Sequence, residues 1–193
     1  MADGCLSRNR YSDSFTTSIS LRDEEMVRRF ARFISKDKPT YSYTNISGNP
    51  MTTFAFSNKL INNVLISLGM NERKSLTLKF PEWIKTHPLK HHFIRGYFDG
   101  DGCVSEKKHQ TKTWLHIAIV GSKDFINTLN EIFSQELGIS PRKVIKQGKV
   151  FSLHIGKIEY VQKFKEFIYK DSSIALERKK AIFDNHSELK FGS

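Results

Sequence analysis

Two acidic residues, Asp99 and Asp101, follow an apolar, glycine-containing stretch and directly precede a strand-like segment. Pro88 suits the first turn of a helix, and apolar residues follow it at helical spacing. The sequence therefore predicts a helix over about residues 88–100 that Gly102 closes. This prediction puts Asp101 at the C-terminal end of a helix.

A carboxylate at that end faces the negative pole of the helix dipole, which normally favours Lys or Arg. Some other cation should therefore compensate the charge of Asp101. Asp99 and Asp101 are two residues apart and do not share a helix face, so they are not expected to chelate one ion by themselves. A partner carboxylate must come from elsewhere in the chain.

The N-terminus repeats the segment around Asp101. Residues 3–7 (Asp-Gly-Cys-Leu-Ser) match residues 101–105 (Asp-Gly-Cys-Val-Ser) at four of five positions, with an offset of 101 − 3 = 98. Lys59 and Lys157, each just after a strand-like run, are related by the same offset. The chain is therefore interpreted as a tandem duplication in which Asp3 is the counterpart of Asp101.

Residues 94–102, Ile-Arg-Gly-Tyr-Phe-Asp-Gly-Asp-Gly, resemble the LAGLIDADG signature, also called DOD, of homing endonucleases. Residues 2–4, Ala-Asp-Gly, look like the tail of a second copy, and the resemblance extends to about residue 185. It implies an α+β fold of tandem pseudo-symmetric αββαββα repeats whose antiparallel sheets form a DNA-binding saddle. The first copy begins at its last three residues, so its helix is missing. We hypothesise that the reading frame starts upstream, which an in-frame stop immediately before Met1 would refute.

The repeats divide the chain into a first repeat over 1–80, a connection over 81–90, a second repeat over 91–185 and a tail over 186–193. Alternation and turn residues predict hairpins, and helical spacing predicts helices. Ser20 is expected to begin a capping box. Ser57 is expected to cap the helix whose apolar face is Leu60, Ile61, Val64, Leu65 and Leu68. The expected hairpins are 5–21, 40–57, 103–120 and 142–155, and the expected helices are 22–35, 57–69, 88–100, 123–137, 157–170 and 173–184.

The family resemblance also implies a catalytic arrangement in which two motif helices pack side by side and the final acid of each binds a divalent metal. Carried over, these ligands are Asp3 and Asp101, beside Ala2 and Gly100, and the cofactor is Mg²⁺ or Mn²⁺. From the residues themselves, Gly96 and Gly100 would let two helix backbones approach closely. Two neighbouring carboxylates would repel unless a metal lay between them.

Two lysines complete the implied site. Lys59 and Lys157 resemble the family's basic residues near the attacking water. The alternative interpretation is that each is an ordinary surface lysine.

The charge balance points to a polyanionic partner. The chain has 31 Lys and Arg against 20 Asp and Glu, a net charge of +11 and a pI near 9.6. A two-stranded β-ribbon fits the major groove of DNA, where base edges are unambiguous. Each basic residue alone is more typical of a solvated charge or a phosphate contact. The candidate DNA-binding residues are Arg8, Arg10, Lys107, Lys108, Lys112, His116, Lys143, Lys146 and His154.

These features predict a sequence-specific, metal-dependent DNA endonuclease of the homing type, which makes double-strand breaks at a long target site. The alternative is an inactive relative that binds DNA or intron RNA as a regulator or maturase, which the missing helix favours. An unrelated metal hydrolase is a third possibility, although only His91-His92 cluster and no zinc-ligand spacing occurs.

The remaining expectations concern the state of the chain. No membrane-length apolar run or signal pattern occurs, so we expect an intracellular, cytoplasmic protein with no membrane partner. Two repeats supply two half-sites, so we expect a monomer. Cys5 and Cys103 are expected to be reduced and buried.

Overall fold

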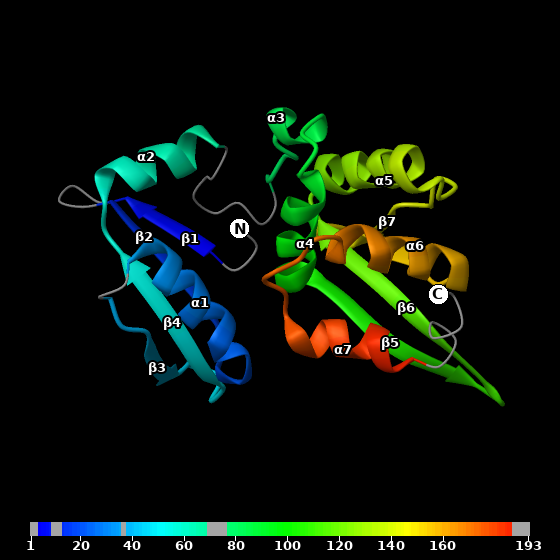
Figure 1. Ribbon diagram of the computed structural model, residues 1–193, viewed down its shortest axis with the longest axis horizontal. Coiled ribbons are helices and arrows are strands. Elements are labelled where there is room, and N and C mark those ends of the chain that lie inside the picture. Colours follow the sequence, from blue (N-terminus) through cyan, green and yellow to red (C-terminus); the bar gives the residue numbers. More distant parts are fainter. Residues whose placement is uncertain (1–3, 9–12, 36–37, 69–76, 187–193) are drawn as a thin grey trace. The chain divides into compact units, whose positions relative to one another are not determined.

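The computed structural model describes residues 4–8, 13–35, 38–68 and 77–186, with the backbone alone for residues 4–8 and 13. The chain divides into two compact units, a first unit up to Lys74 and a second unit from Ser75 (Figure 1). None of the helices in these ranges combines the length and apolar character that crossing a bilayer requires.

The first unit is a four-stranded antiparallel sheet with helices on one face. Its sheet order is β1-β2-β4-β3, and its core is formed by Phe15, Val27, Ala31, Phe54 and Phe56. The elements are β1 (Gly4–Arg8), β2 (Asp13–Ser20), the 3₁₀ turn η1 (Leu21–Asp23), α1 (Glu24–Ile34), β3 (Tyr41–Thr44), β4 (Pro50–Phe56) and α2 (Lys59–Ser67).

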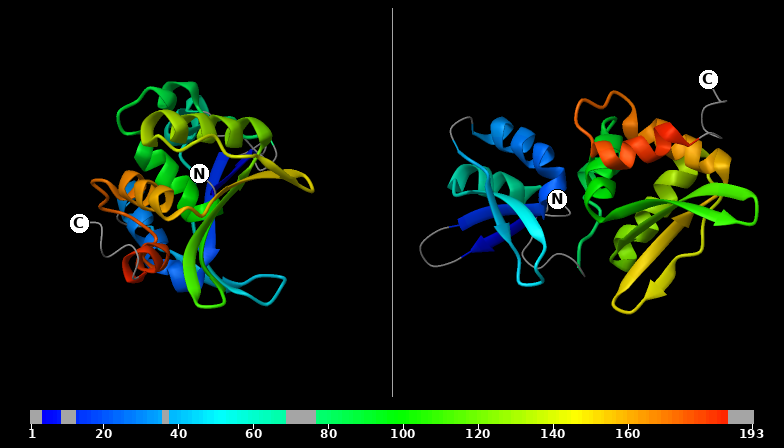
Figure 2. Two further views of the ribbon diagram at one scale, coloured as in Figure 1. Left: turned by 90° about the vertical axis from the view of Figure 1, so that its right-hand side faces the viewer. Right: turned by 90° about the horizontal axis from the view of Figure 1, so that it is seen from below.

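The second unit repeats this order, with the equivalent sheet β5-β6-β8-β7. Its helices lie on one side of the sheet, as the left view of Figure 2 shows. The repeated ββαββα series confirms the predicted α+β architecture of two similar repeats. The elements are α3 (Glu82–Lys85), α4 (Lys90–Asp101), β5 (Gly102–His109), β6 (Lys112–Gly121), α5 (Lys123–Leu137), β7 (Ile145–Gln147), β8 (Val150–Ile155), α6 (Ile158–Tyr169) and α7 (Glu177–Asn185).

The core of the second unit lies between the sheet and α4, α5 and α6. On β6, Leu115, Ile117 and Ile119 are buried at alternate positions, which is the period-2 pattern of a strand with one covered face. Ile94 and Phe98 pack against this face from α4. The apolar stripe of the motif helix thus anchors α4 to the sheet and fixes where its C-terminal end lies.

Helix α5 begins and ends where the sequence predicts. The Ser122 side chain accepts a hydrogen bond from the Phe125 N–H at 3.2 Å and caps the N-terminus. At the other end, Gly138 adopts φ +60°, which a glycine tolerates without strain. Both signals are local, so the sequence alone fixes residues 123–137.

Helix α2 corrects two predictions. Its N-cap is Asn58, one residue after the expected Ser57, because the Asn58 side chain accepts from the Ile61 N–H at 3.1 Å. Leu60 and Val64 are 75% and 48% exposed, so only part of the expected apolar face is buried.

The capping box expected at Ser20 is also wrong, because neither Ser20 nor Asp23 makes a side-chain cap.

Residues 77–89 pack into the second unit, although the sequence predicts the end of the first repeat for residues 77–80 and a connection for residues 81–89. Leu78, Phe80 and Ile84 are all buried in its core. The Phe80 ring lies 5.1 Å from that of Phe93 on α4, and the Ser122 hydroxyl donates to the Leu78 carbonyl. The short helix α3, which was not predicted, lies in this segment.

Candidate functional site

Asp101 is the last residue of α4 and is exposed. Strand β5 begins at the next residue, Gly102, so the carboxylate stands at a direct helix-to-strand junction. A Cβ on Gly102 would meet the Phe98 ring and approach the Phe98 carbonyl oxygen to 2.6 Å. Only glycine fits this junction, which explains the residue that follows the motif acid.

Lys179, on the first turn of α7, lies against the C-terminal end of α4. Its ammonium donates to the carbonyl oxygens of Phe98 at 2.8 Å, Asp99 at 2.7 Å and Gly102. Lys179 is only 4% exposed, so these bonds form away from water. The last four carbonyls of an α-helix lack partners within the helix, and Lys179 binds two of them while opposing the negative end of the dipole.

Asp99 is buried beneath this junction and binds α7 in return. Its Oδ2 accepts the backbone N–H of Leu176, the N-cap of α7, at 3.1 Å. This hydrogen bond links the end of α4 to the beginning of α7. Burial raises the pKa of Asp99 to about 6, against the opposing effects of the Leu176 N–H, Lys179 and Arg95.

The exposed carboxylate of Asp101 suits Mg²⁺. This ion keeps several waters and is usually held by one or two carboxylates together with phosphate oxygens, rather than by an all-protein cage. Within the described part of the chain, no three His, Cys, Asp or Glu residues gather into a site that could hold a metal by themselves. Gly100 is half-buried one residue before Asp101. The other predicted ligands, Asp3 and Ala2, lie outside the described residues.

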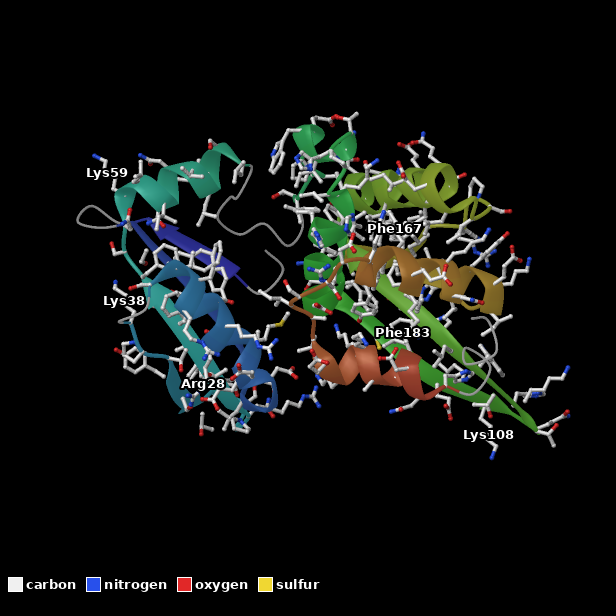
Figure 3. All side chains as sticks on the ribbon, viewed as in Figure 1. Arg28, Lys38, Lys59, Lys108, Phe167 and Phe183 are labelled. Atoms are coloured by element: carbon white, nitrogen blue, oxygen red, sulfur yellow. The ribbon has the colours of Figure 1, made fainter. Side chains whose placement is uncertain are left out.

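Lys157 and Lys59 both lie at the N-terminal ends of helices. Lys157 is the N-cap of α6, exposed, with Nζ 2.7 Å from Oε2 of Glu159. Its ammonium also lies 4.8 Å from the centre of the Tyr160 ring. The hydrogen bond that Lys157 donates to Glu159 raises the pKa of Lys157, so the ammonium stays charged. Lys59 opens α2 and is exposed (Figure 3).

The face of the second sheet away from its helices, here called the open face, carries polar residues. Its composition follows from the buried positions of β6, because strand side chains alternate between faces. Trp114 and His116 therefore lie on the open face, and the register places Lys107 opposite Trp114 and Ser105 opposite His116. The residues of the open face include Ser105, Lys107, Lys112, Trp114, His116, Gln147 and His154.

Strand alternation separates two predicted DNA-binding lysines from the open face, and a third lies outside the strands. Lys108 is opposite Thr113 and Lys146 is opposite Phe151, which is the phase of the helix-covered side. Lys108 lies near the projecting end of the β5–β6 hairpin (Figure 3). Lys143 is exposed in the segment before β7. These three lysines therefore do not lie among the polar residues of the open face.

His116 and His154 are brought together on the open face. Their rings are stacked, with centroids 5.1 Å apart and an interplanar angle of 28°. The Ser152 hydroxyl lies 2.9 Å from Nε2 of His154. Burial, followed by His154 and Lys107, lowers the pKa of His116.

The first unit has its own polar sheet face. The Ser18 hydroxyl donates to Oγ1 of Thr53 at 2.7 Å, and Oγ1 of Thr53 donates to the Thr17 carbonyl at 3.0 Å. Arg8 pairs with Asp13 in the ladder between β1 and β2. Arg10 lies outside the described residues.

Sequence reasoning missed several of these positions. Lys179 had one usable signal, the recurrence of Glu-Arg-Lys at 72–74 and 177–179, but nothing in that recurrence shows that the lysine is buried. Ser105 and Gln147 could have been found by extending the strand alternation. Cys103 was expected to be buried, but it is exposed because it shares the phase of the open face.

The comparisons with known proteins agree with this architecture. Residues 89–169 match the family described as LAGLIDADG-like domain. The structure resembles the homing endonuclease I-GzeII in complex with its DNA target, at TM-score 0.60 and 13% identity, over 95% of this chain and 84% of that one. It also resembles the meganuclease I-CpaMI bound to uncleaved DNA, at TM-score 0.65 and 12% identity, over 95% and 85%.

A third similar structure is I-SmaMI bound to cleaved DNA, at TM-score 0.61 and 12% identity, over 95% of this chain and 83% of that one. No curated protein matched the sequence. At 12–13% identity, the similarity to these structures establishes the fold alone. The family match covers the part of the chain that contains α4. Residues 89–169 thus match the LAGLIDADG-like domain family, and the chain has the fold of the LAGLIDADG homing endonucleases.

Proposed function

We propose that this chain is a sequence-specific, metal-dependent DNA endonuclease of the homing type, which makes double-strand breaks at a long target site. Its partner is double-stranded DNA, and two repeats in one chain make it a monomer. The DNA-bound and cleaved-DNA states named for the similar structures support the partner.

The observation that carries this proposal is the position of Asp101. An exposed carboxylate ends α4 at the residue before β5, and β5 carries Ser105 and Lys107 on the open face. A carboxylate directed at DNA is unfavourable for a simple binding protein, because it repels phosphate. The same carboxylate is useful when a divalent cation stands between it and the phosphate.

The proposed roles follow from charge and exposure. Asp101, together with Asp3 of the first motif, would hold Mg²⁺ or Mn²⁺, beside Gly100 and Ala2. When bound, such an ion supplies Lewis-acid stabilisation of phosphate oxygens and lowers the pKa of a bound water. Lys157, charged and exposed at the N-terminus of α6, and its counterpart Lys59 would stabilise negative charge near the scissile phosphates.

The open face would read the major groove. Lysines at its outer end contact phosphates, and His116, His154, Ser105 and Gln147 offer donors and acceptors to base edges. The net charge of +11 supplies the salt-dependent part of the affinity.

The test is cleavage of the protein's own genomic locus, with its intron or insertion removed, in Mg²⁺, in Mn²⁺ and in EDTA. Asp101→Asn removes the proposed metal ligand, and Glu131→Gln, at an exposed site on α5, is the matched control. We expect metal-dependent double-strand cutting by the wild type and the control, and at least a hundredfold loss in Asp101→Asn.

Salt-sensitive binding of this DNA without cutting in either metal would overturn the endonuclease proposal and leave a DNA-binding relative. Preferential binding of the intron transcript would instead indicate an RNA-binding maturase. Full activity of Asp101→Asn would show that the carboxylate is not a metal ligand.

A further inference from the structure

The C-terminal end of α4 and the N-terminal end of α7 are joined by two charged side chains, each of which bonds to backbone groups of the other element. The Lys179 ammonium on α7 donates to three carbonyls at the α4–β5 junction. In the other direction, the Asp99 carboxylate on α4 accepts the Leu176 N–H. An ammonium has three N–H donors, and each of the three carbonyls can accept one of them. The Nζ atom of Lys179 also lies 5.2 Å from the centre of the Phe98 ring.

Ordinary core packing does not account for this lysine. Lys179 is the third residue of α7, where the positive end of the helix dipole disfavours a cation. A buried ammonium also loses its hydration, and an apolar side chain of similar length would fill the volume without that cost. The position of Lys179 is therefore unfavourable for α7 itself, and its benefit falls on the end of α4.

The bonded carbonyls lie on both sides of Asp101. Phe98 and Asp99 precede it in the last turn of α4, and Gly102 follows it as the first residue of β5. Lys179 thus holds backbone carbonyls on both sides of Asp101, two before it and one after it. It also places a positive charge where the helix dipole is most unfavourable for a neighbouring carboxylate.

We propose that Lys179 is a positioning residue that holds the α4–β5 junction so that Asp101 presents its carboxylate to a divalent cation. This inference rests on the proposed function, because it requires Asp101 to be a metal ligand. Lys179 itself touches neither the cation nor the DNA.

The experiment measures the affinity of the full-length chain for Mn²⁺ alone by electron paramagnetic resonance, without DNA. The variants are Asp101→Asn, Lys179→Met and Lys179→Arg. Lys180→Met is the matched control, because Lys180 is the next residue on α7 and pairs with Asp184 at 2.5 Å. Amide hydrogen exchange at residues 101–104 reports the order of the junction independently of metal and of activity.

We expect Asp101→Asn to remove one Mn²⁺ site and Lys179→Met to weaken that site at least tenfold, with faster exchange at residues 101–104. Lys180→Met should match the wild type in both measurements. Lys179→Arg keeps the charge and the fold, but its planar guanidinium cannot aim three donors at three carbonyls, so we expect a smaller loss of Mn²⁺ affinity.

Two results would overturn the inference, and they differ in meaning. If Asp101→Asn loses the Mn²⁺ site while Lys179→Arg binds Mn²⁺ with wild-type affinity and shows wild-type exchange, Lys179 is only structural and the proposed function stands. If Asp101→Asn retains wild-type Mn²⁺ binding, Asp101 is not a ligand, and the proposed function fails together with this inference.

Discussion

His116 on β6 and His154 on β8 stack their imidazole rings 5.1 Å apart across the two central strands of the second sheet. Two protonated rings at this distance would repel, and Lys107 adds a further positive charge. The pKa of His116 is accordingly below its usual value. Bound DNA would reverse this balance, because phosphates favour the charged ring.

DNA affinity should therefore depend on pH through His116. Bound DNA should raise the pKa of His116 above its value in the free protein. Between these two pKa values DNA binding takes up a proton, so affinity rises as pH falls through that range. Fluorescence anisotropy at fixed ionic strength should show a gain of about three- to tenfold between pH 8 and pH 6.

His116→Gln should remove most of this gain, whereas His87→Gln, at an exposed turn before α4, should retain it. An identical pH dependence in wild type and His116→Gln would show that His116 does not meet DNA.

The buried carboxyl of Asp99 should make stability depend on pH. Its pKa is raised from 3.8 to about 6 in the folded chain, so the folded state binds a proton more tightly than the unfolded state. This contribution to stability is fully present below about pH 4 and is lost as pH rises through 6, for a total of about 3 kcal/mol.

Asp99→Asn removes this titration and keeps an oxygen that can accept the Leu176 N–H. Urea unfolding at pH 4, 5, 6 and 7 should show the variant gaining stability relative to the wild type, by up to about 3 kcal/mol at pH 7. A constant difference across this range would contradict the prediction.

Two glycines of the motif should respond in opposite ways to alanine. At Gly102 a new Cβ meets the Phe98 ring and carbonyl, so Gly102→Ala should destabilise the second unit by about 1 to 3 kcal/mol. At Gly96, exposed in mid-helix, a Cβ meets nothing within 4 Å, so Gly96→Ala should stabilise it by about 0.5 to 1 kcal/mol.

In a version of the chain extended upstream to supply the first motif helix, Gly96→Ala should nevertheless lose cleavage activity, because we propose that Gly96 and Gly100 let the two motif helices approach closely. Thermal denaturation together with the cleavage assay separates these effects. A Gly96→Ala variant that is both more stable and fully active would remove the proposed close packing.

Lys157 and Lys163 provide a comparison of matched charges. Both ammonium groups pair with Glu159, at 2.7 Å and 3.5 Å, and both are well exposed. Lys157→Met should lower the cleavage rate at saturating protein at least about tenfold, because it removes a charge proposed to act near the reacting phosphate.

Lys163→Met should leave the cleavage rate unchanged, and both variants should keep the melting temperature of the wild type. Equal cleavage rates for the two variants would show that Lys157 is an ordinary surface lysine with no role in cleavage.

Local signals were sufficient for much of the fold. Ser122 and Gly138 define α5, and the alternation of Leu115, Ile117 and Ile119 defines β6, because caps and strand periodicity depend on neighbouring residues only. The predicted burial of Leu60 was wrong, because burial depends on which elements cover the helix, and helical spacing cannot show this.

The candidate site was less predictable for the same reason. The motif reveals Asp101, but the partner of its helix end, Lys179, lies 78 residues later in the sequence (179 − 101 = 78). A lysine on a helix is normally read as solvated. Only the tertiary fold shows that this one is buried against α4.

The packing of Leu78, Phe80 and Ile84 has a practical consequence for dividing this protein into parts. A second repeat cut to begin at the motif helix would lack three side chains of its own core, and Ser122 would lose its acceptor on the Leu78 carbonyl. An autonomous half suitable for domain shuffling or fusion should therefore begin no later than residue 77, well ahead of the helix by which such a domain is recognised.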